Sequence, residues 1–267
     1  MRLGVIADVH GNLPALEAVL SRLAELSVDA VVNLGDCASG PLWPAATVRL
    51  LRASTMSHVR GNHDRALGTT SPDGLGTSDS HAWHDLDAEA RNWLATLPFE
   101  IEIGGARCFH GSPKDDDTYL LDAIEGGRLV AARPEAVEAL IGTAGQAVVL
   151  CGHSHQPRLL RLGDGTVVVN PGSVGNPAYR ATEPSIHVSE SGGPHARFAV
   201  VTISDAVAIE LYAIAYDWEQ AARRAEANGR ADWAHALRTG RVLRSQQPSS
   251  QAPKAGVDRF SESGHPR

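Results

Sequence analysis

The stretch Leu3-Gly-Val-Ile-Ala-Asp-Val-His10 begins with a continuous apolar run and ends in a carboxylate and an imidazole. An uninterrupted short apolar run is typical of a strand buried on both faces, as in the sheets of α/β proteins. Asn12 then provides a helix cap, Pro14 suits a first helical turn, and leucines recur downstream at helical spacing. The stretch therefore predicts the first strand and helix of an α/β fold.

The same alternation of short apolar runs and amphipathic stretches continues along the chain. We expect helices at 45–52 and 87–97, and further strands at 30–34, 56–59, 100–103, 107–109, 147–150, 167–169, 198–203 and 208–214. The region 67–84 is rich in Gly, Ser, Thr and Asp, which predicts a long loop that can act as a lid. No role is assigned to the segments 65–85 and 179–196.

The C-terminal part divides into a helical extension and a tail. Asp217 starts a capping-box pattern that predicts helix over about 217–240, interrupted near Asn228-Gly229. Residues 245–267 contain almost no apolar side chains, which predicts a disordered tail. We therefore expect a single domain over 1–244.

Composition narrows the class of protein. With 267 residues, 43% hydrophobic, the chain is long enough for one α/β core, and its net charge of -7 disfavours a nucleic-acid partner. No apolar run approaches the ~20 residues of a membrane helix. The N-terminal residues do not resemble a signal peptide, and the 3 cysteines cannot all pair with one another. A cytoplasmic protein that acts on a small molecule is expected, and nothing in the sequence indicates its oligomeric state.

Side chains that can bind metal follow the expected strands, at the sheet edge where α/β proteins bind ligands. They are Asp8, His10, Asp36, Asn62, His110, His153 and His155. Carboxylate, amide and imidazole together favour transition metals, with Mn the first choice and Fe, Ni, Co or Zn as alternatives, over Mg or Ca. Seven ligands are too many for one ion, whereas two ions about 3.5–4 Å apart that share a carboxylate would use them all. The sequence predicts a dinuclear centre suited to phosphoryl transfer.

Five motifs carry a resemblance to a known family. In order they are Asp8-Val-His10, Gly35-Asp36, Gly61-Asn-His-Asp64, the isolated His110, and Gly152-His-Ser-His155. From residue 8 to about 177 the chain resembles the calcineurin-like metallophosphoesterases. The resemblance implies a four-layer α/β/β/α sandwich with two mixed sheets. It also implies two metal sites: Asp8, His10 and His155 in the first, Asn62, His110 and His153 in the second, and Asp36 bridging them.

The resemblance further implies a mechanism. A metal-bridging water attacks the phosphorus, while His63 protonates the leaving group. Arg60 is expected to help neutralise the phosphoryl charge. A metal dipeptide of helical HD-type phosphohydrolases is the alternative for His63-Asp64, but the strand expected before it argues against that class.

The second motif bears on the substrate. Gly35-Asp-Cys-Ala-Ser-Gly-Pro41 lacks the run that Ser/Thr protein phosphatases carry there. The stretches 109–119 and 170–175 resemble the small bacterial and archaeal branch, which includes phosphodiesterases and diadenosine tetraphosphatase-like proteins. We therefore expect a phosphodiesterase-like hydrolase acting on a phosphodiester or phosphoanhydride of a small or nucleotide-like molecule. A Ser/Thr protein phosphatase and a non-catalytic metal-binding scaffold are the alternatives.

Three residues are expected to contact the substrate. Gly172, together with Gly175, allows a turn whose N–H groups face a phosphate, Tyr119 can stack or hydrogen-bond, and Arg180 can bind a second phosphate. A purely structural turn at Gly172 and Gly175, and a ring of Tyr119 that only packs in the core, are equally good interpretations.

The remaining histidines are expected on the surface or in loops: His58, His81, His84, His187, His195, His235 and His265. The three cysteines are expected to be small buried hydrophobes, with metal ligation or redox inactivation as the alternative. The carboxylates at 115–117 receive no role.

Overall fold

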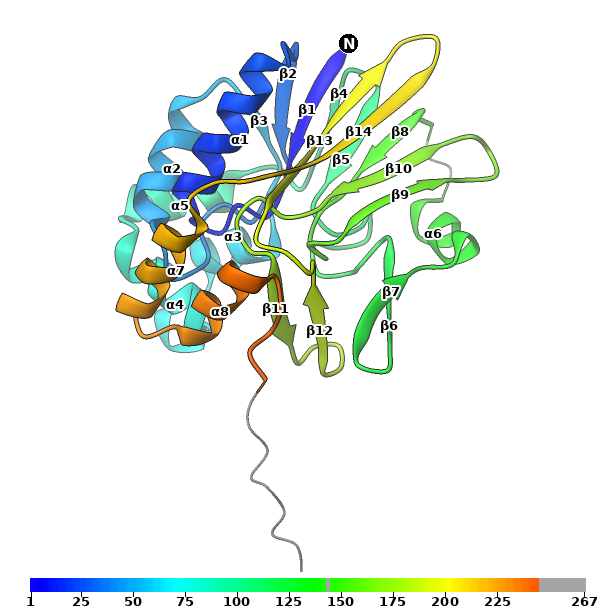
Figure 1. Ribbon diagram of the computed structural model, residues 1–267. Helices are drawn as coiled ribbons and strands as arrows, with labels where there is room; N and C mark the ends of the chain where they lie inside the picture. Colours follow the sequence, from blue (N-terminus) through cyan, green and yellow to red (C-terminus); the bar gives the residue numbers. More distant parts are fainter. Residues whose placement is uncertain (143–144, 245–267) are drawn as a thin grey trace, which may run out of the picture.

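Two mixed β-sheets pack against each other at the centre of the computed structural model, which describes residues 1–142 and 145–244 (Figure 1). The first sheet has the order β14-β13-β1-β2-β3. Its strands are β1 (Arg2–Ile6), β2 (Ala30–Asn33), β3 (Ser57–His58), β13 (Ala196–Ile203) and β14 (Val207–Ile214). β1, β2 and β3 run parallel, and β13 and β14 join antiparallel. The parallel strands therefore end at one common edge.

The second sheet has the order β4-β5-β8-β10-β9. Its strands are β4 (Glu100–Ile103), β5 (Ala106–Phe109), β8 (Val148–Leu150), β9 (Pro157–Arg161) and β10 (Val167–Pro171). Small and β-branched side chains such as Val5, Val201, Cys108 and Val148 fill the space between the two sheets and are fully buried. Close packing of such side chains holds the two sheet edges together, and these edges carry the candidate site.

Helices cover the outer faces of both sheets, and the last two of the chain lie beside the carboxyl-end edge of the first sheet. They are α1 (Leu13–Glu25), α2 (Pro44–Ala53), α3 (Asn62–Thr69), α4 (Thr77–Asp85), α5 (Ala88–Thr96), α6 (Pro134–Ile141), α7 (Trp218–Ala227) and α8 (Ala231–Thr239). Leu16 and Leu94 lie in the buried cluster on the outer face of the first sheet, and Val137 of α6 lies in the cluster on the second. The expected α/β class with mixed sheets is confirmed, as are the caps at Asn12, Asp87 and Asp217.

The structure differs from expectation in its third sheet. This sheet has the order β11-β12-β7-β6 and contains β6 (Asp122–Glu125), β7 (Arg128–Ala131), β11 (Ala178–Ala181) and β12 (His187–Glu190). Two sheets were expected from the family resemblance. The strands of the third sheet were not recognised because they are short and their buried positions include polar residues such as Asp122 and Ser189. Hydropathy therefore does not mark them.

The expected loop over 67–84 is wrong, because the region is mostly helical. α3 runs to Thr69, a 3-10 turn covers Pro72–Gly74, and α4 follows. α4 was missed because it has no apolar stripe: its buried residues are Asp79 and Ala82. His63 also lies in the first turn of α3, so the argument that a preceding strand excludes a helical setting for it does not hold.

The C-terminal helices pack beside the carboxyl-end edge of the first sheet (Figure 1). α7 and α8 are separated at Asn228-Gly229, as expected. Trp233 of α8 is buried beside Leu42, and a Cβ on Gly40 would lie 2.7 Å from its ring. The predicted tail at 245–267 lies outside the described residues.

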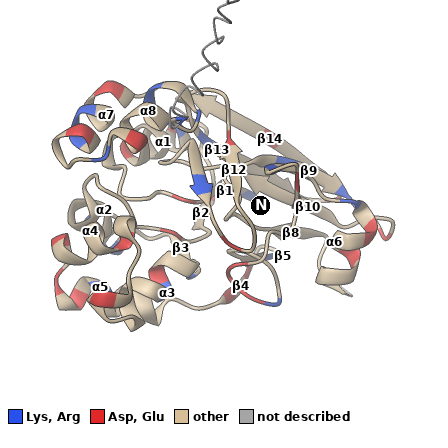
Figure 2. Ribbon diagram, turned by 90° about the horizontal axis from the view of Figure 1, so that it is seen from below, with Lys and Arg blue, Asp and Glu red and all other residues tan. Residues whose placement is uncertain are grey.

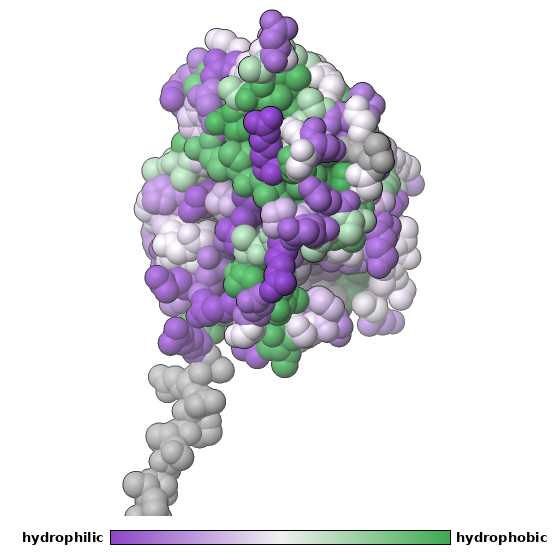
Figure 3. All heavy atoms as spheres, turned by 90° about the vertical axis from the view of Figure 1, so that its right-hand side faces the viewer, coloured by the Kyte–Doolittle hydropathy of each residue, from purple (hydrophilic) through white to green (hydrophobic). Residues whose placement is uncertain are grey.

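The surface agrees with a chain of negative net charge. Acidic residues lie on the outer helices α4, α5 and α7 (Figure 2). Hydrophobic surface gathers in the upper half of the face shown in Figure 3, and the exposed large hydrophobics of the structure include Leu159 of β9 and Leu211 of β14. Among the described helices, none is long and apolar enough to cross a membrane.

Candidate metal centre

The loops that follow β1, β2, β5, β8 and β10 are tied together by backbone hydrogen bonds. The N–H of Asp8 donates to the carbonyl of Gly35 at 3.0 Å, and that of Gly152 donates to the carbonyl of His110 at 2.7 Å. The N–H of Gly175 donates to the carbonyl of Asp8 at 3.0 Å. Residues far apart in the sequence are thus fixed relative to one another at a single rim.

Five of the seven predicted metal ligands have left-handed backbone. Their φ angles are 57° for Asp8, 50° for His10, 56° for Asp36, 67° for His153 and 59° for His155. Ser27 is the remaining non-glycine residue with positive φ in the described part of the chain. Such backbone costs about 1–3 kcal/mol per residue and tends to gather at functional sites. The local strain turns each side chain inward at the end of its strand.

The inward side chains form two groups. Asp8, His10 and His155 make the first, and Asp36, His110 and His153 the second, and in each group the candidate ligand atoms lie within 4.8 Å of one another. Asn62 joins the second, with its Oδ1 3.1 Å from His110 Nε2. Asp36 Oδ2 lies between the groups, 3.7 Å from His10 Nε2 and 3.4 Å from His110 Nε2. The structure therefore brings all seven predicted ligands together.

Backbone carbonyls fix the orientation of three imidazoles. The Nδ1 atoms of His10, His110 and His155 lie 2.9, 2.7 and 2.7 Å from the carbonyl oxygens of residues 39, 34 and 176. Each Nδ1 therefore carries a proton and donates to its carbonyl, and the Nε2 atom of each ring is directed into the site. His153 differs, because its Nε2 lies 2.9 Å from the Asp117 carbonyl and its Nδ1 is left to face a metal.

Two features of the buried groups fit a cation. The Nε2 atoms of His10 and His155 face each other at 3.0 Å, so two lone pairs meet unless a positive charge lies near them. Both carboxylate oxygens of Asp8 are buried and lack a hydrogen-bond partner among the described residues. His155 Nε2 lies 3.4 Å from Oδ1 of this carboxylate, and a buried charge that accepts no hydrogen bond is costly. Mixed carboxylate, amide and imidazole donors are suited to divalent transition metals.

The charge states also suit metal binding. Burial and the nearby His155 lower the pKa of His10 to about 4, and burial and His110 lower the pKa of His153 to about 3. Burial raises the pKa of Asp36, but His110 and His63 outweigh it and bring the pKa well below its usual value. Burial lowers the pKa of His110, but Asp36 and Asp8 outweigh it and raise the pKa to about 10, so a metal would have to displace a proton from this ring. Neutral imidazoles beside an ionised carboxylate are the forms that bind a metal.

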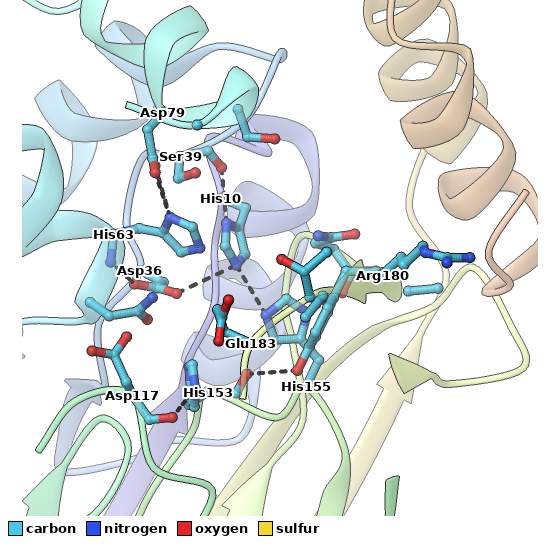
Figure 4. Close-up of a pocket in the computed structure, with 18 of the residues that line it drawn as sticks. His10, Asp36, Ser39, His63, Asp79, Asp117, His153, His155, Arg180 and Glu183 are labelled. Atoms are coloured by element: carbon cyan, nitrogen blue, oxygen red, sulfur yellow. Dashed lines mark hydrogen bonds and ion pairs between the residues drawn. The ribbon is translucent and has the colours of Figure 1, made fainter. Parts of the chain in front are cut away.

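His63 lies next to this centre without being part of either group (Figure 4). Its backbone N–H donates to Asp36 Oδ1 at 3.0 Å, and its Nδ1 lies 2.8 Å from Asp79 Oδ1. Burial lowers the pKa of His63, but the carboxylates of Asp36 and Asp79 outweigh it and raise the pKa to about 10. A carboxylate that holds one ring nitrogen leaves the other free to reach a ligand in the cavity.

Two functional carboxylates were missed in the sequence. Asp79 lies on α4, which was expected to be loop. Asp64 accepts hydrogen bonds from the backbone N–H groups of Gly61, Asp36 and Cys37 at 3.0, 2.8 and 2.9 Å. It thereby fixes the turn that presents Asp36. The signal for Asp64 was present, since it is the fourth residue of the Gly-Asn-His-Asp motif.

A cavity of about 1390 Å³ extends from the metal centre between the third sheet, α4 and α8 (Figure 4). Its walls include His63, Tyr119, Arg180, Glu183 and Trp233. Arg180 is exposed and has no ion-pair partner within 1–142 and 145–244. Of the predicted substrate contacts, Tyr119 and Arg180 therefore lie at the cavity.

Arg60 and Gly172 do not take the expected positions. Arg60 is not among the residues that line the cavity, and its Nε lies 4.0 Å from Asp116 Oδ2. The N–H of Gly172 donates to Asn170 Oδ1 at 2.8 Å, and the N–H of Gly175 donates to Asp8. These groups are already engaged, so the turn is structural and does not face a phosphate.

The structure also explains the acidic residues at 115–117. Asp115 accepts the backbone N–H groups of residues 117 and 118, at 3.1 and 2.7 Å. Asp116 is buried and, like Asp117, forms an ion pair with Arg65 at 2.8 Å. These carboxylates shape the loop that carries Tyr119.

All three cysteines are buried and free, as expected for small hydrophobes. His187, expected at the surface, is 1% exposed.

Comparison with known proteins places the chain in a family. Residues 1–191 match the model of the calcineurin-like phosphoesterase superfamily domain. An uncharacterized protein of Methanocaldococcus jannaschii is 28% identical over 191 residues, which cover 66% of this chain and 76% of that protein.

Solved structures share the fold. A metallophosphoesterase from Sphaerobacter thermophilus superposes with a TM-score of 0.68 at 24% identity, covering 89% of this chain and 99% of that one. A hypothetical protein from Pyrococcus horikoshii superposes with a TM-score of 0.70 at 22% identity, covering 90% and 98%. The match over residues 1–191 and the shared fold show that the chain belongs to the calcineurin-like phosphoesterase superfamily.

Proposed function

We propose that this protein is a dinuclear-metal-dependent phosphoesterase that hydrolyses a phosphodiester or phosphoanhydride of a small or nucleotide-like molecule. The position of Asp36 carries the proposal: its Oδ2 lies 3.7 Å from His10 Nε2 and 3.4 Å from His110 Nε2, between the two groups of side chains. A carboxylate shared in this way suits two ions that act on one phosphoryl group. Manganese is the first candidate metal, and a cytoplasmic location stays a prediction.

Each residue has a defined task in this proposal. Asp8, His10 and His155 would hold one ion, Asn62, His110 and His153 would hold the other, and Asp36 would be shared between them. When bound, the two ions polarise the phosphoryl oxygens and increase the acidity of water. His63 donates a proton or a hydrogen bond to the leaving oxygen, and Asp79 holds its ring in place. Asp64 orients the turn that presents Asp36.

The cavity supports a substrate of nucleotide size. Its volume of about 1390 Å³ exceeds the roughly 300–1,000 Å³ of most small-molecule sites. The side chain of Arg180 extends from β11 away from the metal-facing histidines (Figure 4). Arg180 is placed to bind a second anionic group of the substrate. Arg60 instead lies beside Asp116 and is assigned a structural role.

The test is hydrolysis of bis-p-nitrophenyl phosphate by the purified protein with added Mn²⁺. We expect hydrolysis by the wild type and its loss in the double variant Asp36→Ala/His110→Ala. The matched control is Asp205→Ala/His84→Ala, which removes the same two residue types from exposed positions and is expected to retain activity. Unchanged activity in the first double variant would refute the proposed site.

The same preparation separates the alternative functions. Faster hydrolysis of phosphopeptides than of dinucleoside polyphosphates would favour a protein phosphatase. A folded protein that binds Mn²⁺ but hydrolyses none of the phosphomonoesters, diesters, cyclic nucleotides and dinucleoside polyphosphates in a panel would favour a scaffold. We expect turnover of at least one diester or anhydride, with loss of the pH dependence of the rate in His63→Ala.

A further inference from the structure

His187 lies at the end of a partly buried chain of hydrogen bonds that leads to the metal centre. This histidine of β12 belongs to none of the five motifs and is 1% exposed. Its Nε2 lies 2.8 Å from the hydroxyl of Tyr119, and its Nδ1 lies 2.7 Å from the carbonyl oxygen of Ser185. The hydroxyl of Tyr119 lies 2.7 Å from that of Tyr179 on β11. Three side chains from different segments thus share one network.

The direction of these hydrogen bonds follows from the available protons. The Ser185 carbonyl only accepts, so Nδ1 of His187 must donate to it, and Nε2 of the neutral ring must then accept. The hydroxyl of Tyr119 therefore donates to His187. Because Tyr119 has used its single proton, the hydroxyl of Tyr179 donates to Tyr119. Every polar atom of the chain has a partner, which fixes both phenol rings.

Each fixed ring contacts one imidazole of the Gly-His-Ser-His motif. The ring of Tyr119 stacks on His153 with 4.7 Å between centroids and 29° between planes. The ring of Tyr179 meets His155 edge to face at 4.6 Å and 72°. The two tyrosines therefore support the two histidines from the side of the third sheet.

His153 depends on this support more than the other histidines do. His10, His110 and His155 are buried and fixed by a backbone carbonyl at Nδ1. His153 is half-buried, and the carbonyl partner of its Nε2 belongs to Asp117, which is exposed. The stacked ring of Tyr119 and the Asp117 carbonyl together limit rotation of His153 about its side-chain bonds.

We propose that Tyr119 and His187 are positioning residues that hold His153 in its metal-binding orientation, so that His187, remote from the ions, sets the affinity of one of the two metal sites. The inference rests on the proposed function only in assigning His153 to a metal site. Partners that orient a metal-binding histidine typically change metal affinity about 10–100-fold when removed.

Metal titration of the whole chain tests this without any assay of hydrolysis. Isothermal titration calorimetry with Mn²⁺, on protein freed of metal by chelation, should resolve two binding events in the wild type. In His187→Leu, which leaves Tyr119 without its acceptor, we expect one event to weaken about 10-fold or more and the other to change little. His187→Gln keeps an acceptor for Tyr119 and should stay within about 3-fold of the wild type, rescuing the affinity.

A second pair of variants tests the stacked ring. Tyr119→Leu removes the ring and should weaken the same single event, whereas Tyr119→Phe keeps the ring and should weaken it less. The matched control is Tyr212→Leu on β14, where a tyrosine stacked on Phe198 at 4.7 Å is lost far from the site. Both events should be unchanged in this control. The melting temperature without metal shows whether each variant folds.

The outcomes are distinct. Folded His187→Leu and Tyr119→Leu that bind both ions as the wild type does would overturn the proposed positioning role while leaving the proposed function intact. Equal weakening of both events would also overturn it, because a general loss of structure would then explain the result. A wild type that binds no Mn²⁺ would overturn the proposed function and this inference together.

Discussion

The Nε2 atoms of His10 and His155 lie 3.0 Å apart, although 145 positions separate the two residues in the sequence. Each ring is fixed by a hydrogen bond from Nδ1 to a carbonyl, to residue 39 and residue 176 respectively. The protein therefore holds two electron-rich nitrogens together, beside the buried carboxylate of Asp8. Such an arrangement is unfavourable without a cation, and the metal-free and metal-loaded proteins should differ in stability.

We predict that Mn²⁺ raises the melting temperature of the chelator-treated protein. An ion supplied at about a hundred times its dissociation constant contributes about 2.7 kcal/mol. For a chain of this size each kcal/mol corresponds to about 2–4 °C, so the increase should be at least about 5 °C. Differential scanning calorimetry checks it. Asp36→Asn should lose most of the increase, because Asp36 lies between both groups; an equal increase in that variant would contradict the shared ligand.

We predict that Asp79→Asn lowers the rate most for substrates with poor leaving groups. Asp79 accepts the Nδ1–H of His63, so the substitution loosens the ring that is proposed to protonate the leaving oxygen. A p-nitrophenolate leaves without much protonation, whereas a nucleoside alkoxide requires it. Comparison of kcat for a p-nitrophenyl ester and an alkyl diester measures the difference. His63→Ala should show the same selectivity more strongly, and equal losses on both substrates would remove His63 from the role of acid.

The metal centre was predictable from the sequence because its residues follow strands that hydropathy reveals. Val5 and Leu150, for example, are fully buried in strands that lead directly into Asp8 and His153. Asp79 and His187 were not predictable in this way, because the buried positions of α4 and β12 are partly or wholly polar. A segment whose buried face is made of hydrogen-bonded polar groups has no hydrophobic period to detect.

The orientation of backbone groups was also beyond the sequence. The glycines of the Asn-Pro-Gly-Ser turn suggested free N–H groups for a phosphate, but Gly172 donates to Asn170. Likewise the sequence shows a cationic Arg60 next to the motif, but not that Asp116 lies beside it. Such pairings depend on contacts between distant segments, which local sequence does not specify.

We predict that His58 destabilises the protein in acid. Burial, opposed by a hydrogen bond to the Leu51 backbone, lowers the pKa of His58 from 6.5 to about 4. Between these values the unfolded chain binds a proton that the folded chain does not, so stability is complete above pH 6.5 and falls as the pH drops toward 4. Allowing for partial exposure, the loss is about 1–2 kcal/mol.

Urea unfolding of His58→Phe and the wild type, both with chelator, isolates this contribution. The phenyl ring keeps the edge-to-face contact with Trp93 but cannot be protonated. The unfolding free energy of the variant relative to the wild type should rise by about 1–2 kcal/mol between pH 7.5 and pH 5. Acid titration of the other histidines affects both proteins alike. If the difference in unfolding free energy between His58→Phe and the wild type stays constant with pH, His58 does not contribute to the loss of stability in acid.

The last prediction concerns Gly61, which precedes Asn62 and caps α3. A Cβ at this position would collide with Oδ1 of Asp36 and lie 2.8 Å from its Cγ. Gly61→Ala should therefore displace the Asp36 carboxylate from its place between the two metal groups. A displacement of about 1 Å near the reacting atoms can reduce the rate about 100-fold, and we expect at least that loss in kcat/KM on bis-p-nitrophenyl phosphate.

Gly76 offers a matched control, since it occupies the same capping position before α4 and also has extended backbone. Gly76 lines the cavity, but a Cβ there has no neighbour within 4 Å, so Gly76→Ala should cost only a few tenths of a kcal/mol and reduce kcat/KM far less than Gly61→Ala does. Circular dichroism melts show whether the Gly61→Ala protein is folded when it is assayed. If folded Gly61→Ala hydrolyses the substrate as fast as Gly76→Ala does, the position of Asp36 is not what the reaction depends on, and the bridging role proposed for it is wrong.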